Sequence, residues 1–195
     1  MMNDIDISIQ ESVKEQKEIE KQWLELKENI KNKIATDSIG GISFLDSLIE
    51  SKKRYTNYQK IELLLFSWEI LYELEAYQLA LEQCIKATKL SKLKDPLNMI
   101  YQAGSYTQLG NFDSAKKIII EATEYSPQYN WLLGNLYEVI KEKELAIQQY
   151  EQLYKSDTIR FHFCVERIKE IESGTPLLLE LDYSKIEEVP KLIIM

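Results

Sequence analysis

Few residues in this chain of 195 have a type and spacing that could carry out chemistry. His162 is the only histidine, and Cys84 and Cys164 are the only cysteines. His162 and Cys164 stand two positions apart in a helical pattern, so their side chains face different directions and a Cys-His dyad is not predicted. Both cysteines lie in helical patterns without metal-ligand spacing, which predicts two buried thiols in a reducing compartment.

The remaining polar motifs also favour structural roles. Gly40 and Gly41 form the only Gly-Gly pair, but the Lys and Ser/Thr of a phosphate-binding loop are missing from their expected places, so the pair is predicted to be a turn. No HExxH, GxSxG, CxxC or Walker pattern is present, and the carboxylates fall on charged helix faces. The sequence therefore predicts a protein that is not an enzyme and that uses no cofactor and no metal ion.

Composition restricts the partners and the fold class. The chain has 32 acidic and 24 basic residues, a net charge of −8, so nucleic acid and anionic membranes are not expected partners. It has neither a basic start with an apolar leader nor a run of about 18 apolar residues, which predicts a cytoplasmic protein. Six Gly and four Pro beside 29% charged residues favour an all-α fold.

An N-terminal helical extension is predicted over residues 1–57. Apolar residues recur at helical spacing from Ile19 to Ile34, and Ser8 with Glu11 forms a capping box, which predicts a helix from about 9 to 34. Its first half is almost entirely Glu, Gln and Lys, so that half either projects toward a partner or is a frayed, solvated start. After the Gly-Gly turn, Ser43 with Asp46 predicts a cap on a short helix that ends near residue 55.

Residues 96–127 contain a pattern that predicts two closely packed antiparallel helices. Small residues are needed where the helices cross, Gly110 can form the left-handed turn between them, and Pro127 ends the second helix. The residues that carry the pattern are Ala103, Tyr106, Gly110, Phe112, Ala115, Ala122 and Pro127. This pattern resembles the tetratricopeptide repeat (TPR), a helical hairpin of about 34 residues.

Two further copies of the pattern flank this one in register, at about 61–95 and 127–158. Glu75 and Lys141 stand where the turn glycine is expected, and Trp68 replaces a small residue, which predicts a wider first hairpin. Residues 159–172 predict a capping helix. The resemblance implies a short right-handed solenoid of three TPR-like hairpins with this capping helix over 58–172.

The C-terminal tail, residues 173–195, has a different pattern. Leu177, Leu179, Leu181 and Tyr183 alternate with other residues in a period of two, which predicts an extended apolar segment after Pro176. The tail either packs along its own hairpins or inserts into a neighbouring molecule and forms a homodimer.

The resemblance also implies a binding surface, because the first helix of each hairpin lines the concave groove of such proteins. We expect this groove to be formed by Phe66, Glu69, Tyr72, Glu73, Ile100, Tyr101, Gln108, Trp131, Leu132, Asn135 and Glu138. Aromatic and acidic side chains suit a peptide or partner protein that is apolar, with or without basic residues. Phe66, Tyr101 and Trp131 can equally be core residues or be covered by the tail.

Two functions remain open at this point. The first is a protein-protein interaction module, such as an adaptor, scaffold or chaperone, that holds a client polypeptide in the groove. The second is a self-assembling structural subunit joined through the N-terminal helix and the C-terminal tail. Among client-binding proteins, the chain is similar to bacterial type III secretion chaperones in its size, acidity and three repeats, which is an analogy of fold alone.

Overall fold

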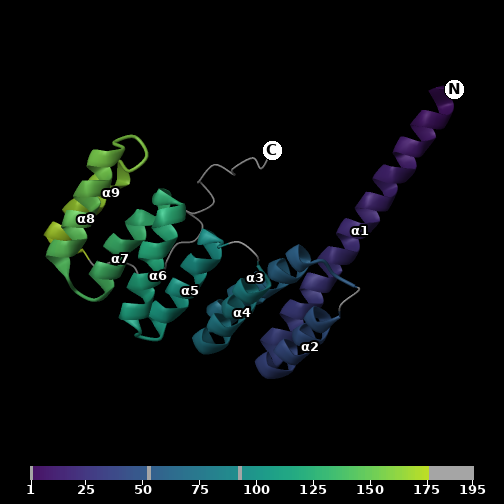
Figure 1. The fold of residues 1–195 in the computed structure, drawn as a ribbon, viewed down its shortest axis with the longest axis horizontal. Helices are drawn as coiled ribbons and strands as arrows, with labels where there is room; N and C mark the ends of the chain where they lie inside the picture. The colour runs from purple at the N-terminus through teal and green to yellow at the C-terminus, as the bar shows by residue number, and fades with distance from the viewer. Residues whose placement is uncertain (1, 52–53, 92–93, 176–195) are drawn as a thin grey trace. The chain divides into compact units, whose positions relative to one another are not determined.

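The computed structural model describes residues 2–51, 54–91 and 94–175, without the side chains of residues 2–13 and 128 (Figure 1). All regular elements in these residues are helices, which confirms the all-α prediction. The chain divides into two compact units, residues 1–94 and 95–195. The last 20 residues, which contain most of the predicted tail, lie outside the described part.

The described residues of the first unit form four helices. They are α1 (Met2–Thr36), α2 (Ser38–Glu50), α3 (Asn57–Glu73) and α4 (Tyr77–Leu90). Helix α1 packs against α2 and α3, and α3 packs against α4. Helix α3 begins with the capping box of Thr56 and Gln59, in which each residue's side chain bonds the other's backbone N–H and so satisfies two N–H groups that have no partner within the helix.

In its described residues, the second unit contains two further hairpins followed by one more helix. Its elements are α5 (Pro96–Gln108), α6 (Phe112–Tyr125), the 3-10 helix η1 (Pro127–Asn130), α7 (Trp131–Val139), α8 (Lys143–Ser156) and α9 (Phe163–Ser173). Helix α5 packs against α6, α7 packs against α8, and α9 packs against α8. Pro96 starts α5 at a position where a missing N–H costs nothing, with Asp95 as its side-chain cap.

The three predicted hairpins are present, and their turns share one backbone geometry. Glu75, Gly110 and Lys141 have φ of +58°, +73° and +64°, so each is in the left-handed region. In each turn the next N–H donates to the carbonyl oxygen five residues earlier, as in the 2.9 Å bond from Asn111 to Tyr106. This is the Schellman motif, so the turn forms in the first and third hairpins without glycine.

Gly134 explains how close the helices of the third hairpin come. A Cβ atom at this position would lie 2.6 Å from Cζ of Tyr150, which is itself almost fully buried. The absence of a side chain on α7 thus makes room for the ring from α8. In the first hairpin the large residue is on the other helix, because Trp68 is buried in α3 and the matching position of α4 is Cys84.

The predicted turn at Gly40 and Gly41 is wrong. The turn between α1 and α2 is Asp37 alone, and both glycines lie inside α2, which begins at Ser38 rather than Ser43. A Cβ atom at Gly41 would lie 2.6 Å from Cα of Ile34, so this glycine allows α2 to pack directly on the backbone of α1. Gly41 thus serves a close helix crossing, which is the other common use of glycine in helical proteins, whereas Gly40 is exposed.

Three further boundaries differ from prediction. Helix α2 ends at Glu50 and not near residue 55. Helix α1 begins at Met2, before the expected cap at Ser8. The final helix begins at Phe163 instead of residue 159, because Asp157 accepts hydrogen bonds from the backbone N–H groups of Ile159 and Arg160 and holds a turn there. Within the described residues, no helix is both long and apolar enough to cross a membrane.

Candidate functional site

The described residues that the sequence assigned to the groove fall in both units. Those from α3 belong to the first unit, and those from α5 and α7 belong to the second, so each group is considered by itself. In the first unit, Glu69 and Glu73 are exposed, while Phe66 and Tyr72 are half-buried. All four therefore reach the surface of the first unit.

One face of α3 carries alternating aromatic and acidic side chains. Its members recur every three or four residues, which places them along one side of the helix. We call this surface the α3 stripe; it consists of Tyr58, Glu62, Phe66, Glu69 and Glu73. Tyr58 is 77% exposed, which is unusual for so large a ring.

Helix α1 holds the first half of the α3 stripe in place. The Nζ atom of Lys27 lies 2.5 Å from Oε1 of Glu62 and 5.4 Å from the centre of the Phe66 ring. Trp23 donates its indole N–H to the same carboxylate oxygen at 3.0 Å. Glu62 is thus paired with a lysine, and the same lysine partly covers the ring of Phe66.

Tyr72 is fixed by aromatic neighbours rather than by α1. Its ring centre lies 4.9 Å from that of Trp68 and 5.1 Å from that of Tyr77, with the second pair edge to face. Such pairs each contribute about 0.5–1.5 kcal/mol beyond area burial. The half-exposed ring beside the α3 stripe is therefore held in one orientation.

In the second unit, two of the expected groove residues lie in the core. Ile100 is 2% exposed and Leu132 is 4% exposed, and both pack in a cluster with Ala103, Ile119 and Leu136. Their side chains are not available on the surface in this structure. Tyr101 and Gln108 are half-buried on α5 and make other contacts.

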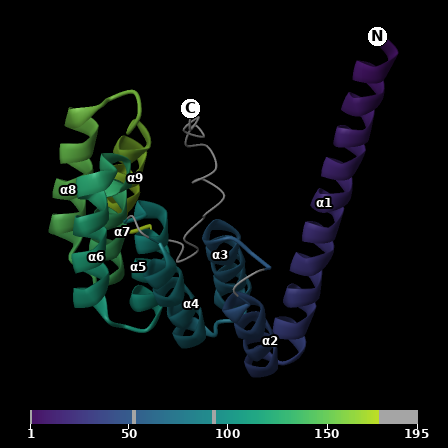
Figure 2. The ribbon, with the colours of Figure 1, turned by 45° about the vertical axis from the view of Figure 1, so that its right-hand side comes forward.

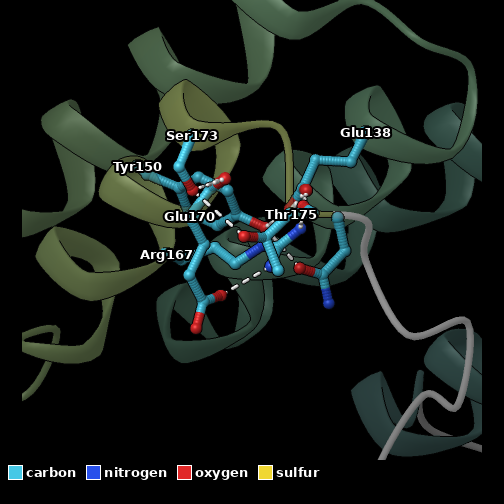
Figure 3. Close-up of polar contacts among 7 residues, drawn as sticks. Glu138, Tyr150, Arg167, Glu170, Ser173 and Thr175 are labelled. Carbon is cyan, nitrogen blue, oxygen red and sulfur yellow. Dashed lines mark hydrogen bonds and ion pairs between the residues drawn. The ribbon is translucent and has the colours of Figure 1, made fainter.

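Glu138 and Asn135 belong to a polar cluster that joins α7, α8 and α9 (Figure 3). The Nε atom of Arg167 lies 3.0 and 3.1 Å from the two carboxylate oxygens of Glu138, and Nη2 donates to the same group. Tyr150 Oη lies 2.8 Å from Oε1 of Glu138 and also contacts Oδ1 of Asn135. Glu138 is therefore an anchor for α9 and not a carboxylate open to a ligand.

The same cluster extends to the end of α9. Nη1 of Arg167 lies 2.6 Å from a carboxylate oxygen of Glu170, and Nη2 reaches the backbone oxygen of Thr175 at 3.4 Å. Figure 3 shows Arg167 between these groups. Hydrogen bonds and ion pairs to Glu138 and Glu170 raise the pKa of the guanidinium although partial burial opposes this. Burial, and then the charge of Glu138, raises the pKa of Tyr150, which keeps its hydroxyl neutral.

Trp131 also faces the final helix. Its ring lies 6.3 Å from that of Phe163, edge to face, and packs at the junction of the two core clusters of this unit. All three of the expected groove residues from α7 that reach beyond the core, Trp131, Asn135 and Glu138, therefore have contacts that involve α8 or α9.

The two cysteines are buried, as the sequence predicts, whereas His162 precedes α9 instead of lying within it. Cys84 and Cys164 are free and buried, and burial raises the pKa of Cys164 to about 12 and that of Cys84 further. Both are therefore neutral thiols near pH 7. His162 is exposed, with Nδ1 3.0 Å from the backbone oxygen of Ile159. Within the part of the chain that the structure describes, no cluster of His, Cys, Asp or Glu could hold a metal ion.

Sequence reasoning missed the contacts that α1 and α9 make with these surfaces. Lys27 and Glu62 are 35 residues apart, and Arg167 and Glu138 are 29 residues apart, so no local pattern connects them. The only available signal was that Lys27 and Arg167 are basic residues on amphipathic helices, which does not identify the residue that each one contacts.

The chain was compared with known proteins. No family model matches it, and no curated protein is similar to it.

Proposed function

We propose that this protein is a protein-binding module of TPR-like hairpins, and that the α3 stripe is part of its binding surface. The repeated Schellman turns at Glu75, Gly110 and Lys141 support the TPR-like relationship, because equivalent positions adopt equivalent backbone geometry with and without glycine. The stripe itself carries the functional proposal, because it presents aromatic rings and carboxylates along one exposed helix face.

The chemistry of the α3 stripe defines the partner. Tyr58 and the half-exposed Phe66 offer apolar surface, and Glu69 and Glu73 follow within two turns of the helix. Aromatic anchors supply most of the affinity at protein interfaces, and neighbouring charges supply specificity and register. The partner is therefore a polypeptide with apolar side chains and a Lys or Arg that meets Glu69 or Glu73, which fits a cytoplasmic adaptor or chaperone.

The proposal is tested by selection from a library of random peptides of about 15 residues displayed against the full chain. The selected peptides are expected to contain an aromatic or aliphatic residue close to Lys or Arg. Their affinity is then measured by fluorescence anisotropy against Glu73→Lys, and against Glu82→Lys as a control, because Glu82 is an exposed glutamate on α4 of the same unit.

The two variants carry the same change in charge, so they separate the site from the overall field of the protein. We expect Glu73→Lys to weaken binding by about fivefold or more and Glu82→Lys by less than about twofold. Equal losses, or selected peptides without basic residues, would contradict the proposal. Circular dichroism of both variants confirms that the helices are intact.

A further inference from the structure

Helix α1 has a line of apolar side chains, which we call the seam, and one of them, Ile19, lies beyond the helices that cover the others. In its second half Ile30 and Ile34 are fully buried, and Trp23 and Leu26 are half-buried. These residues follow one another at intervals of three and four, so they lie along one line of the helix. Since α1 packs against α2 and α3, this line is the interface of α1 with the rest of the first unit.

The next residue on that line has no such cover. Ile19 stands four residues before Trp23 and is 59% exposed, and every residue from 14 to 22 is exposed. Figures 1 and 2 both show the first half of α1 running clear of α2 and α3. Helix α1 has 35 residues, which corresponds to a length of about 52 Å.

Aromatic side chains mark the place where the cover ends. Trp23 contacts Tyr55, whose ring centre lies 6.0 Å away, and its indole N–H bonds Glu62 on the second turn of α3. Tyr58, in the first turn of α3, is largely exposed. A helix of another molecule that packed on Ile19 along the seam would therefore meet these aromatic side chains at one end.

In the exposed part of α1, acidic residues lie on both sides of the seam and basic residues lie on the opposite face of the helix. At about 100° per residue, Glu15 and Glu20 flank the line of Gln16, Ile19 and Trp23, one on each side. The three lysines of this segment lie on the opposite face; they are Lys14, Lys17 and Lys21. No basic residue between 14 and 22 stands beside the seam.

We propose that the first half of α1 is a docking arm for a helix of another protein, one that carries apolar residues along a face flanked by Lys or Arg. A second copy of this chain is disfavoured, because either orientation would bring Glu15 and Glu20 against glutamates. The chain's own residues 176–195 contain four acidic and two basic residues, so they are disfavoured by the same repulsion. A partner helix with Lys or Arg on both sides of its apolar face can form ion pairs with Glu15 and Glu20.

The arm is a helix before binding, which lowers the cost of association. Gln22 donates to Glu18 at 3.2 Å, and Lys21 lies 3.8 Å from Glu25, so polar pairs on the exposed sides support the helix without using the seam. A preformed helix does not lose backbone entropy when the partner docks. This surface meets the α3 stripe at Tyr58 and Glu62 but does not include Glu69 or Glu73.

The test uses the full chain and two labelled synthetic peptides of about 28 residues, each with Leu and Ile along a heptad seam. One peptide has Lys at both flanking positions and the other has Glu. Fluorescence anisotropy at about 0.15 M salt is expected to show binding of the Lys peptide and at least about tenfold weaker binding of the Glu peptide. Equal affinities would overturn the proposal.

Matched variants locate the binding on the helix. Glu20→Lys, beside the seam, should weaken binding of the Lys peptide by about fivefold, whereas Glu18→Lys, on the far side, should change it by less than about twofold. Ile19→Gln should weaken binding by about tenfold without a change in charge. If Glu18→Lys and Glu20→Lys have equal effects, the binding is a general attraction to an acidic protein and the proposal is wrong.

Two additional measurements test whether a second copy of the chain occupies the arm and whether the peptide binds the α3 stripe instead. Sedimentation equilibrium of the full chain should show a mass that Ile19→Gln does not change; a dimer lost in that variant would show that a second copy occupies the arm. Glu73→Lys should bind the Lys peptide within about twofold of wild type. Loss of binding in that variant would show that the peptide binds the α3 stripe and would overturn the proposal of a docking arm.

Discussion

The left-handed turns of the three hairpins predict that replacing either of two residues with glycine raises the free energy of unfolding. Glu75 and Lys141 occupy the position that Gly110 occupies in the second hairpin, and all three are exposed. A side chain in the left-handed region destabilises the folded state by about 1–2 kcal/mol, and glycine removes this strain. Glycine also destabilises the protein by about 0.4–1 kcal/mol, because it has greater freedom in the unfolded chain. The net conformational gain from glycine is therefore about 0.5–1 kcal/mol.

Helix dipoles make the two gains unequal. Glu75 follows the C-terminus of α3, where a negative charge is unfavourable by about 0.3–1 kcal/mol, so Glu75→Gly removes both penalties. Lys141 follows the C-terminus of α7, where a positive charge is favourable, so Lys141→Gly loses part of its gain. We expect stabilisation of about 1 kcal/mol for Glu75→Gly and about 0–0.5 kcal/mol for Lys141→Gly.

Urea unfolding of the full chain, followed by circular dichroism, measures these differences. Gly110→Ala is the reverse experiment: no atom lies within 4 Å of a Cβ added there, so its expected loss of about 1 kcal/mol is conformational rather than steric. Glu75→Gln measures the charge effect alone. A neutral Gly110→Ala, or a Glu75→Gly that destabilises the protein as glycine does inside a helix, would refute the reasoning.

Three further changes test the second unit. Gly134→Ala should destabilise it by about 2 kcal/mol, because the new Cβ would overlap the ring of Tyr150, and thermal unfolding measures this loss. Arg167→Met should cost about 3 kcal/mol, because it leaves the carboxylate of Glu138 buried without its cation, and adding Glu138→Gln should recover part of the loss in urea unfolding. The pKa of Cys164 is raised in the folded state from 9.0 to about 12, so its contribution to stability is full below pH 9 and is lost as the pH rises toward 12; in Cys164→Ala the alkaline decline in unfolding free energy should be smaller.

The helical hairpins could be predicted from the sequence because their pattern repeats. Small residues and aromatics recur in register, so the turns at Glu75 and Lys141 could be located even though neither is glycine. A single copy of the pattern would not have allowed this. The Gly-Gly pair before α2 has no second copy, and glycine serves both turns and close helix crossings. The contact of Gly41 with Ile34 decides between these uses, and that contact is visible only in three dimensions.

The candidate surface was harder to predict than the fold, because periodicity identifies a helix face without identifying its neighbour. Phe66 and Glu138 were both assigned to the groove by register. The structure places Phe66 under Lys27 of α1, and Glu138 under Arg167 of α9. Both covering residues come from segments without any resemblance to the repeat, so the repeat pattern contained no information about them.

These two contacts bear on the proposed binding surface. An acidic helix face binds a basic polypeptide most strongly where its carboxylates are not already paired, and α1 and α9 each supply a cation to one carboxylate on a first helix of a hairpin. In the α3 stripe, Glu62 is paired with Lys27, whereas Glu73 is exposed. In the first unit, the helix that supplies Lys27 to Glu62 also carries the exposed side chain of Ile19.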